Sequence, residues 1–97
     1  FALIADGDSM IGDRIHDGDV VFIRQQNDAD DGSIVAVAVD DEMMLKHISR
    51  VKAPDGTTLY TIFTSSNPKY APISVGGENE TRNVYILGKA VAFRSLL

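Results

Sequence analysis

Residues 34–48 read Ile-Val-Ala-Val-Ala-Val-Asp-Asp-Glu-Met-Met-Leu-Lys-His-Ile, two apolar runs on either side of an acidic pair. In the first run Val35, Val37 and Val39 alternate along the chain, so they share one side of a β-strand. The pair Asp40-Asp41 suits the two-residue turn of a hairpin, because aspartate tolerates the positive φ that such turns require. This stretch predicts a strand over 34–39, a tight turn and a return strand over 42–48.

The flanking segments also favour short strands separated by turns. An apolar run occupies residues 1–5, and further strands are expected at 20–23, 57–63 and 84–93. The continuous run 20–23 predicts a strand buried on both faces. Gly88 inside the last strand predicts a bulge or a close approach of another backbone. Only the segment after Ser9 offers a helical turn, so the expected fold class is mainly β, in a single domain covering residues 1–97.

Composition narrows the classes of function. The chain has 97 residues, of which 44% are hydrophobic and 24% charged, as in an ordinary globular domain. The absence of cysteine excludes a disulfide framework, thiolate metal sites and a cysteine nucleophile. The acidic segment Asp28–Asp31 lacks the ligand spacing of a calcium loop, and no metal or cofactor is expected. A net charge of −5 is the wrong sign for a domain whose own surface binds nucleic acid. No apolar run approaches the length of a membrane span, so no contact with a membrane is expected.

Lys46 lies between Met44 and Ile48 on one face of its expected strand. A lysine with apolar neighbours either extends its amine to water or holds it desolvated with a lowered pKa. In most proteins such a lysine extends its amine to water. The second becomes attractive if a group nearby needs a neutral amine.

Ser9 is such a group. It follows the apolar run 1–5 in Gly7-Asp8-Ser9-Met10, where a glycine-containing turn can present the hydroxyl on a bend. The backbone N–H groups of Ser9 and Met10 would then face a developing oxyanion. Together with Lys46 this predicts a Ser–Lys dyad that uses no histidine. His47 alternates with Lys46 and points to the opposite face, which disfavours a Ser–His–Asp triad.

Several motifs occur in an order that resembles a known family. They are Gly7-Asp8-Ser9-Met10, Asp17-Gly18-Asp19, Gly32, Leu45-Lys46-His47-Ile48, Asn67-Pro68 and Gly88. Over nearly the whole chain the sequence resembles the C-terminal domains of LexA-like and lambdoid phage repressors. These form a self-cleaving Ser–Lys peptidase family to which the mutagenesis protein UmuD is related.

The resemblance implies a β-rich, signal-peptidase-like fold with Ser9 as nucleophile and Lys46 as general base. It implies an oxyanion site at the N–H groups of Ser9 and Met10. The substrate would be a bond in the protein's own upstream linker, cut when a RecA filament stimulates the reaction. The chain begins at Phe1 without methionine, so the linker and an N-terminal domain that binds operator DNA are expected to lie outside it. The implied location is the cytoplasm of a bacterial or phage-infected cell.

Two other functions stay open. One is an oligomerisation module of a repressor that does not cleave itself, and the other is a signal-peptidase-type serine endopeptidase that acts on other proteins. A repressor that reads a palindromic operator also needs two-fold symmetry, so a homodimer or higher self-association is expected. The apolar stretch 90–93, with Leu96 and Leu97, would contribute to that interface or to the core.

Overall fold

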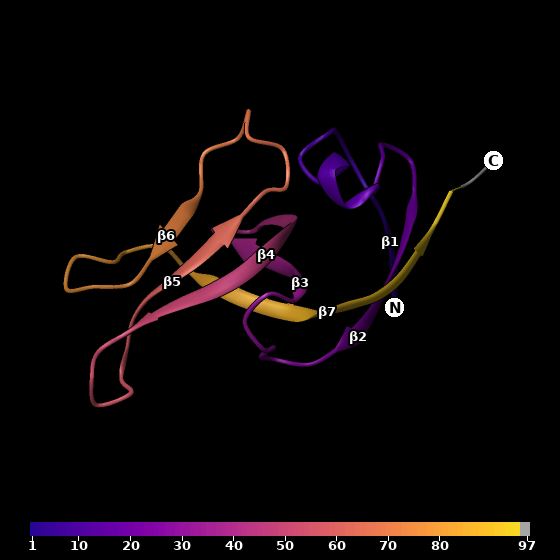
Figure 1. Ribbon diagram of the computed structural model, residues 1–97. Coiled ribbons are helices and arrows are strands. Elements are labelled where there is room, and N and C mark those ends of the chain that lie inside the picture. The colour runs from indigo at the N-terminus through magenta and orange to yellow at the C-terminus, as the bar shows by residue number, and fades with distance from the viewer. Residues whose placement is uncertain (96–97) are drawn as a thin grey trace.

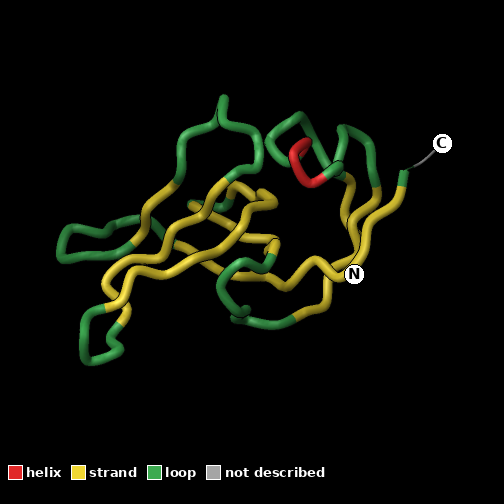
Figure 2. The backbone as a smooth tube through the Cα atoms, in the orientation of Figure 1, coloured by secondary structure: helices red, strands yellow, loops and turns green. Residues whose placement is uncertain are grey.

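In the computed structural model, which describes residues 1–95, the chain forms one curled antiparallel sheet of seven strands (Figure 1). The strands are β1 (Ala2–Ile4), β2 (Val20–Gln25), β3 (Ile34–Val39), β4 (Glu42–Lys52), β5 (Thr58–Thr64), β6 (Ile73–Val75) and β7 (Val84–Arg94). Their order across the sheet is β1-β2-β7-β3-β4-β5-β6. The helical part of residues 1–95 is a single 3-10 turn, η1 (Ile11–Asp13), drawn red in Figure 2. The mainly β fold class predicted from the sequence is therefore confirmed, and the described residues contain no helix able to cross a membrane.

The hairpin predicted at Asp40-Asp41 is present. Both residues have positive φ, 48° and 69°, as the tight turn between β3 and β4 requires. The two strands pair from Val39 opposite Glu42 to Ile34 opposite His47. β4 extends beyond the expected end at residue 48 and reaches Lys52, because its second half pairs with β5.

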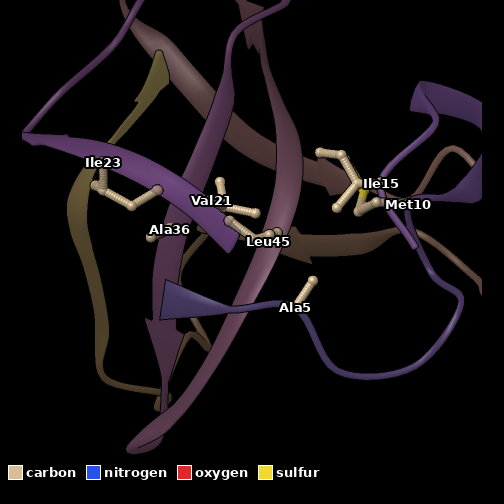
Figure 3. Close-up of a cluster of buried hydrophobic side chains, with 7 residues drawn as sticks. All are labelled: Ala5, Met10, Ile15, Val21, Ile23, Ala36 and Leu45. Atoms are coloured by element: carbon tan, nitrogen blue, oxygen red, sulfur yellow. The ribbon is translucent and has the colours of Figure 1, made fainter. Parts of the chain in front are cut away.

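Two clusters of buried side chains pack against the sheet, and β3 contributes to both. The first core cluster consists of Ala5, Met10, Ile15, Val21, Ile23, Ala36 and Leu45 (Figure 3). The second consists of Ala29, Val35, Val37, Ile48 and Phe63. Successive side chains of a strand point to opposite faces, so β3 sends Ala36 to one cluster and its valines to the other. β4 likewise contributes Leu45 to the first cluster and Ile48 to the second.

The prediction that residues 20–23 form a strand buried on both faces was wrong. Val21 and Ile23 are buried in the first core cluster, whereas Phe22 between them is 37% exposed. Phe22 is paired with two exposed alanines, Ala2 on β1 and Ala92 on β7. This end of the sheet is covered on one face only, so the continuous apolar run does not indicate two-sided burial.

Gly88 lies where two strands approach closely, as the sequence predicted. A Cβ atom at this position would lie 2.3 Å from the carbonyl oxygen of Arg24 on β2. The register of β7 against β3 also shifts beside it, between Ala36 and Val37. Any side chain at residue 88 would push β2 and β7 apart.

Candidate active site

A pocket of about 460 Å³ opens between the end of β1, the loop that follows it, the start of β4 and residues 70–73. Ser9 and Lys46, which lie 37 positions apart in the sequence, both line it. Much of the lining is apolar, from Leu3, Ile4, Met43, Met44, Leu45, Ala71 and Ile73. The acidic side chains on its lining are Asp6 and Glu42. The fold therefore brings the two residues predicted to form a dyad to one concave site with both polar and apolar walls.

Lys46 is desolvated rather than extended to water. It is 7% exposed on β4, and its Nζ donates a hydrogen bond to Ser65 Oγ at 2.5 Å. The ring of Tyr70 lies on another side, with its centroid 5.5 Å from Nζ. Burial lowers the pKa of Lys46 below its ordinary value of 10.5, and the negative charge of Glu42 opposes this in part. A larger fraction of this amine is neutral at a given pH than of an exposed lysine.

Ser9 lies on the irregular loop after β1. The loop turns at Gly7, whose φ is 80° and whose N–H donates to Asp17 Oδ1 at 2.8 Å. Met10 is buried in the first core cluster and anchors the chain just after the serine. Within residues 1–95 no hydrogen bond joins Ser9 to Lys46, and the amine is bonded to Ser65 instead.

The backbone around Ser9 has two free donors. In the described part of the chain, the N–H groups of Ser9 and Met10 have no acceptor. Both residues line the pocket. Unpaired backbone N–H groups beside a candidate nucleophile are what an oxyanion site needs.

Residues 65–70, between β5 and β6, hold the loop that carries Ser9. Asn67 is 8% exposed, its N–H donates to the Ser9 carbonyl at 3.1 Å, and its side-chain amide donates to the Asp8 carbonyl at 3.0 Å. The Tyr70 hydroxyl donates to the Asp8 carboxylate, which also lies 3.3 Å from Lys69 Nζ. These two partners lower the pKa of Asp8.

These contacts of residues 65–70 were not predicted from the sequence. Asn67 was part of the family pattern, but nothing in the pattern showed what its side chain contacts. Ser65 had no signal of its own apart from being a polar residue directly after an apolar strand. Their roles depend on segments about 20 to 60 positions away in the sequence.

His47 is absent from the pocket lining and makes its contacts elsewhere. Its Nε2 lies 2.7 Å from Asp13 Oδ2, and its Nδ1 lies 3.2 Å from the Gly32 carbonyl oxygen. The imidazole thus connects η1 with β4 and the loop before β3. His16 is also absent from the pocket lining, so neither histidine is placed to act on Ser9.

The site is thus a pocket on a β-rich domain that carries a serine and a buried lysine. The family model described as "Peptidase S24-like" matches residues 1–91, and the chain belongs to that family.

Curated relatives specify the kind of S24-like protein that this chain resembles. It is 41% identical over 95 residues to a LexA repressor of Anaeromyxobacter dehalogenans, covering 94% of this chain and 37% of the repressor. It is 43% identical over 91 residues to the LexA repressor of Oleidesulfovibrio alaskensis, covering 94% and 40%. A "LexA repressor 2" of Pseudomonas putida is 46% identical over 74 residues, covering 76% and 34%. The chain thus spans between a third and two fifths of the length of these relatives, and the resemblance drawn from the sequence motifs is confirmed.

Proposed function

We propose that this chain is the C-terminal, self-cleaving domain of a LexA-like transcriptional repressor. The observation that carries the proposal is that Ser9 and the desolvated Lys46 line one pocket of an S24-like domain. In this proposal residues 1–97 form one domain, and the DNA-binding domain and the cleavage linker precede it in the full-length protein.

The proposed chemistry follows from the groups on the pocket. Neutral Lys46 accepts the proton of the Ser9 hydroxyl, and Oγ attacks the carbonyl carbon of the scissile peptide bond. The oxyanion that forms is stabilised by the N–H groups of Ser9 and Met10. Protonated Lys46 then gives its proton to the leaving amine as the C–N bond breaks. Water, deprotonated by the same amine, hydrolyses the ester on Ser9 and regenerates the hydroxyl.

The edge of β4 supports an extended peptide as the substrate. β5 pairs with β4 only from His47 onward, so residues 42–46 have no partner on that side within the described chain. This free edge borders the pocket, because Glu42 to Lys46 all line it. An extended linker segment can add to such an edge through main-chain hydrogen bonds while its side chains enter the pocket.

The remaining parts of the proposal concern partners. Self-association to a dimer or higher oligomer is supported by exposed apolar side chains at one end of the sheet, Phe22 on β2 and Val91 and Phe93 on β7. Leu96 and Leu97, which were also expected to contribute, lie outside the described residues.

A RecA filament would stimulate cleavage in the cytoplasm, and operator DNA would be bound through the preceding domain, in keeping with the net charge of −5. Sedimentation of the full-length protein tests the self-association, and a species that stays monomeric at micromolar concentration contradicts it.

The decisive experiment follows self-cleavage of the full-length protein at about pH 9–10, where much of a perturbed lysine is neutral. Mass spectrometry locates the new N-terminus. We expect a cut upstream of this domain, and we expect Ser9→Ala and Lys46→Ala each to abolish it. Cleavage of Lys46→Ala at the wild-type rate contradicts the dyad. A wild-type protein that self-associates and is never cut is instead an oligomerisation module.

A further inference from the structure

The amine of Lys46 has one hydrogen-bond acceptor among residues 1–95, the hydroxyl oxygen of Ser65. On its own face of β4 the neighbours of Lys46 are Met44 and Ile48, and neither offers a polar atom that can hold an ammonium or amine group. Tyr70 presents a ring face rather than an oxygen. Ser65 is itself 7% exposed, so the hydrogen bond between Lys46 and Ser65 is buried.

The same short segment also holds the nucleophile. Two residues after Ser65, Asn67 donates hydrogen bonds to the carbonyl groups of Ser9 and Asp8. Ser66, between Ser65 and Asn67, lies close to Gly12. A Cβ atom added to Gly12 would be 2.5 Å from the Ser66 carbonyl oxygen. Ser9 and Lys46, which are not hydrogen-bonded to each other, are therefore bonded to two residues of one short segment, Ser9 to Asn67 and Lys46 to Ser65.

We propose that Ser65 is the positioning residue for the general base, and that its hydroxyl oxygen restrains the Lys46 amine for proton transfer from Ser9. The proposal rests on the proposed function. A neutral amine carries two N–H groups and one lone pair, and it rotates freely about its terminal C–N bond. With one N–H bonded to Ser65, the lone pair samples fewer directions, and proton transfer depends on that direction.

Other charged and titratable groups line the pocket or contact Tyr70 on its lining, and the test leaves all of them unchanged. They are Glu42 on β4, Asp6 and Asp8 on the loop after β1, and Lys69 and Tyr70 on the loop after β5. A change in the pH profile of a residue 65 variant is therefore not caused by removing one of these groups.

The experiment measures self-cleavage of the full-length protein from neutral to alkaline pH in Ser65→Ala, Ser65→Thr and Ser66→Ala. Ser65→Ala is expected to lower the limiting alkaline rate by about 10–100-fold, because the amine is no longer oriented. The half-maximal rate is expected to move to lower pH, because the charged amine loses its acceptor. Ser65→Thr keeps the hydroxyl and is expected to restore both the rate and the midpoint.

Ser66→Ala is the matched control, because it removes a neighbouring hydroxyl that is buried and has no hydrogen-bond partner in the described chain. It is expected to cleave with the rate and midpoint of the wild type. General loosening of the loop would admit water to Lys46 and move the midpoint to higher pH, the opposite of the expected shift. A Ser65→Ala protein with a higher midpoint, or with an unchanged rate and midpoint, overturns the proposal.

Failure of this proposal is distinguishable from failure of the proposed function. If Lys46→Ala still cleaves, the dyad itself is wrong and Ser65 positions no base. If Lys46→Ala is inactive while Ser65→Ala behaves as wild type, only the role of Ser65 is wrong. A second readout needs no cleavage: NMR titration of the Lys46 side chain in full-length Ser9→Ala protein. Adding Ser65→Ala is expected to lower that titration midpoint, and an unchanged or raised midpoint overturns the proposal.

Discussion

The two residues proposed to act together are held by different kinds of structure. Lys46 lies on β4, which is hydrogen-bonded to β3 along residues 42–47 and to β5 from His47 onward, and Ile48 nearby is fully buried. Ser9 lies on an irregular loop that belongs to no strand. In Figure 1 that loop, in indigo, and the orange loop after β5 lie next to each other in the upper part of the view. Asn67 connects them, reaching a carbonyl group 59 positions away.

The proposed base and the proposed nucleophile are therefore sensitive to different changes. A strand that is hydrogen-bonded to a neighbouring strand keeps its register as long as the core beneath it is filled, and Lys46 is paired with Val35 of β3. A loop held by a few long-range hydrogen bonds loses its position when one close contact fails, with little effect on the rest of the sheet. Core substitutions should therefore lower stability, and substitutions between the two loops should lower catalysis.

The largest effect on stability is expected from Ile48→Ala in β4. The isoleucine is 0% exposed in the second core cluster, and its truncation should lower the free energy of unfolding by about 2–5 kcal/mol. Val51→Ala on the same strand removes a side chain that is 43% exposed and should change it by less than about 0.5 kcal/mol. Calorimetry of the full-length protein checks both. Equal losses for the two variants would show that β4 is not held by its core contacts.

A smaller loss of stability, with a large loss of activity, is expected from Gly12→Ala. The new Cβ would meet the Ser66 carbonyl oxygen at 2.5 Å and separate the two loops. Overpacking of this kind costs about 1–3 kcal/mol. A displacement of the nucleophile by about 1 Å lowers the rate of self-cleavage by roughly 100-fold.

The control for Gly12→Ala is Ile11→Ala, which shortens a half-exposed side chain one position earlier. It should retain most of the activity. If Gly12→Ala kept the wild-type rate, the close contact between the loops would have no bearing on the position of Ser9.

The smallest effect, confined to the pH profile, is expected from Glu42→Gln. The carboxylate of Glu42 raises the pKa of Lys46, so its removal should lower that pKa further. More of the amine is then neutral near pH 7, and self-cleavage should be faster at neutral pH while the limiting alkaline rate stays the same. Asp41→Asn removes an adjacent charge that does not line the pocket, at a turn position that asparagine tolerates. Rate–pH curves of both variants check this, and a shift to higher pH for Glu42→Gln would contradict it.

Much of the fold was predictable because its signals are local. The hairpin at Asp40-Asp41, the final strand with Gly88 and the short helical turn after Ser9 depend on residues next to one another, and all three are present. Two-sided burial of residues 20–23 was predicted wrongly, because burial depends on what covers a strand rather than on its composition. The length of β4 was underestimated for a similar reason, since its second half is extended by pairing with β5.

The residues of the candidate site also fall into those that local motifs predict and those that they do not. Ser9, Met10 and Lys46 were chosen from the motifs Gly7-Asp8-Ser9-Met10 and Leu45-Lys46-His47-Ile48, which the sequence displays without any structure. Ser65 was not chosen, because a lone serine after a strand carries no signal until it is known what lies beside it.

Strand periodicity, turn chemistry and short motifs all act over a few neighbouring residues, so the mainly β fold class, the central hairpin and the family could be predicted from the sequence alone. The desolvation of the Lys46 amine, its bond to Ser65 and the contact of Asn67 with the loop that carries Ser9 could be seen only in the folded chain. Desolvation and long-range hydrogen bonds depend on which distant segments pack together, and that packing is a property of the whole folded chain.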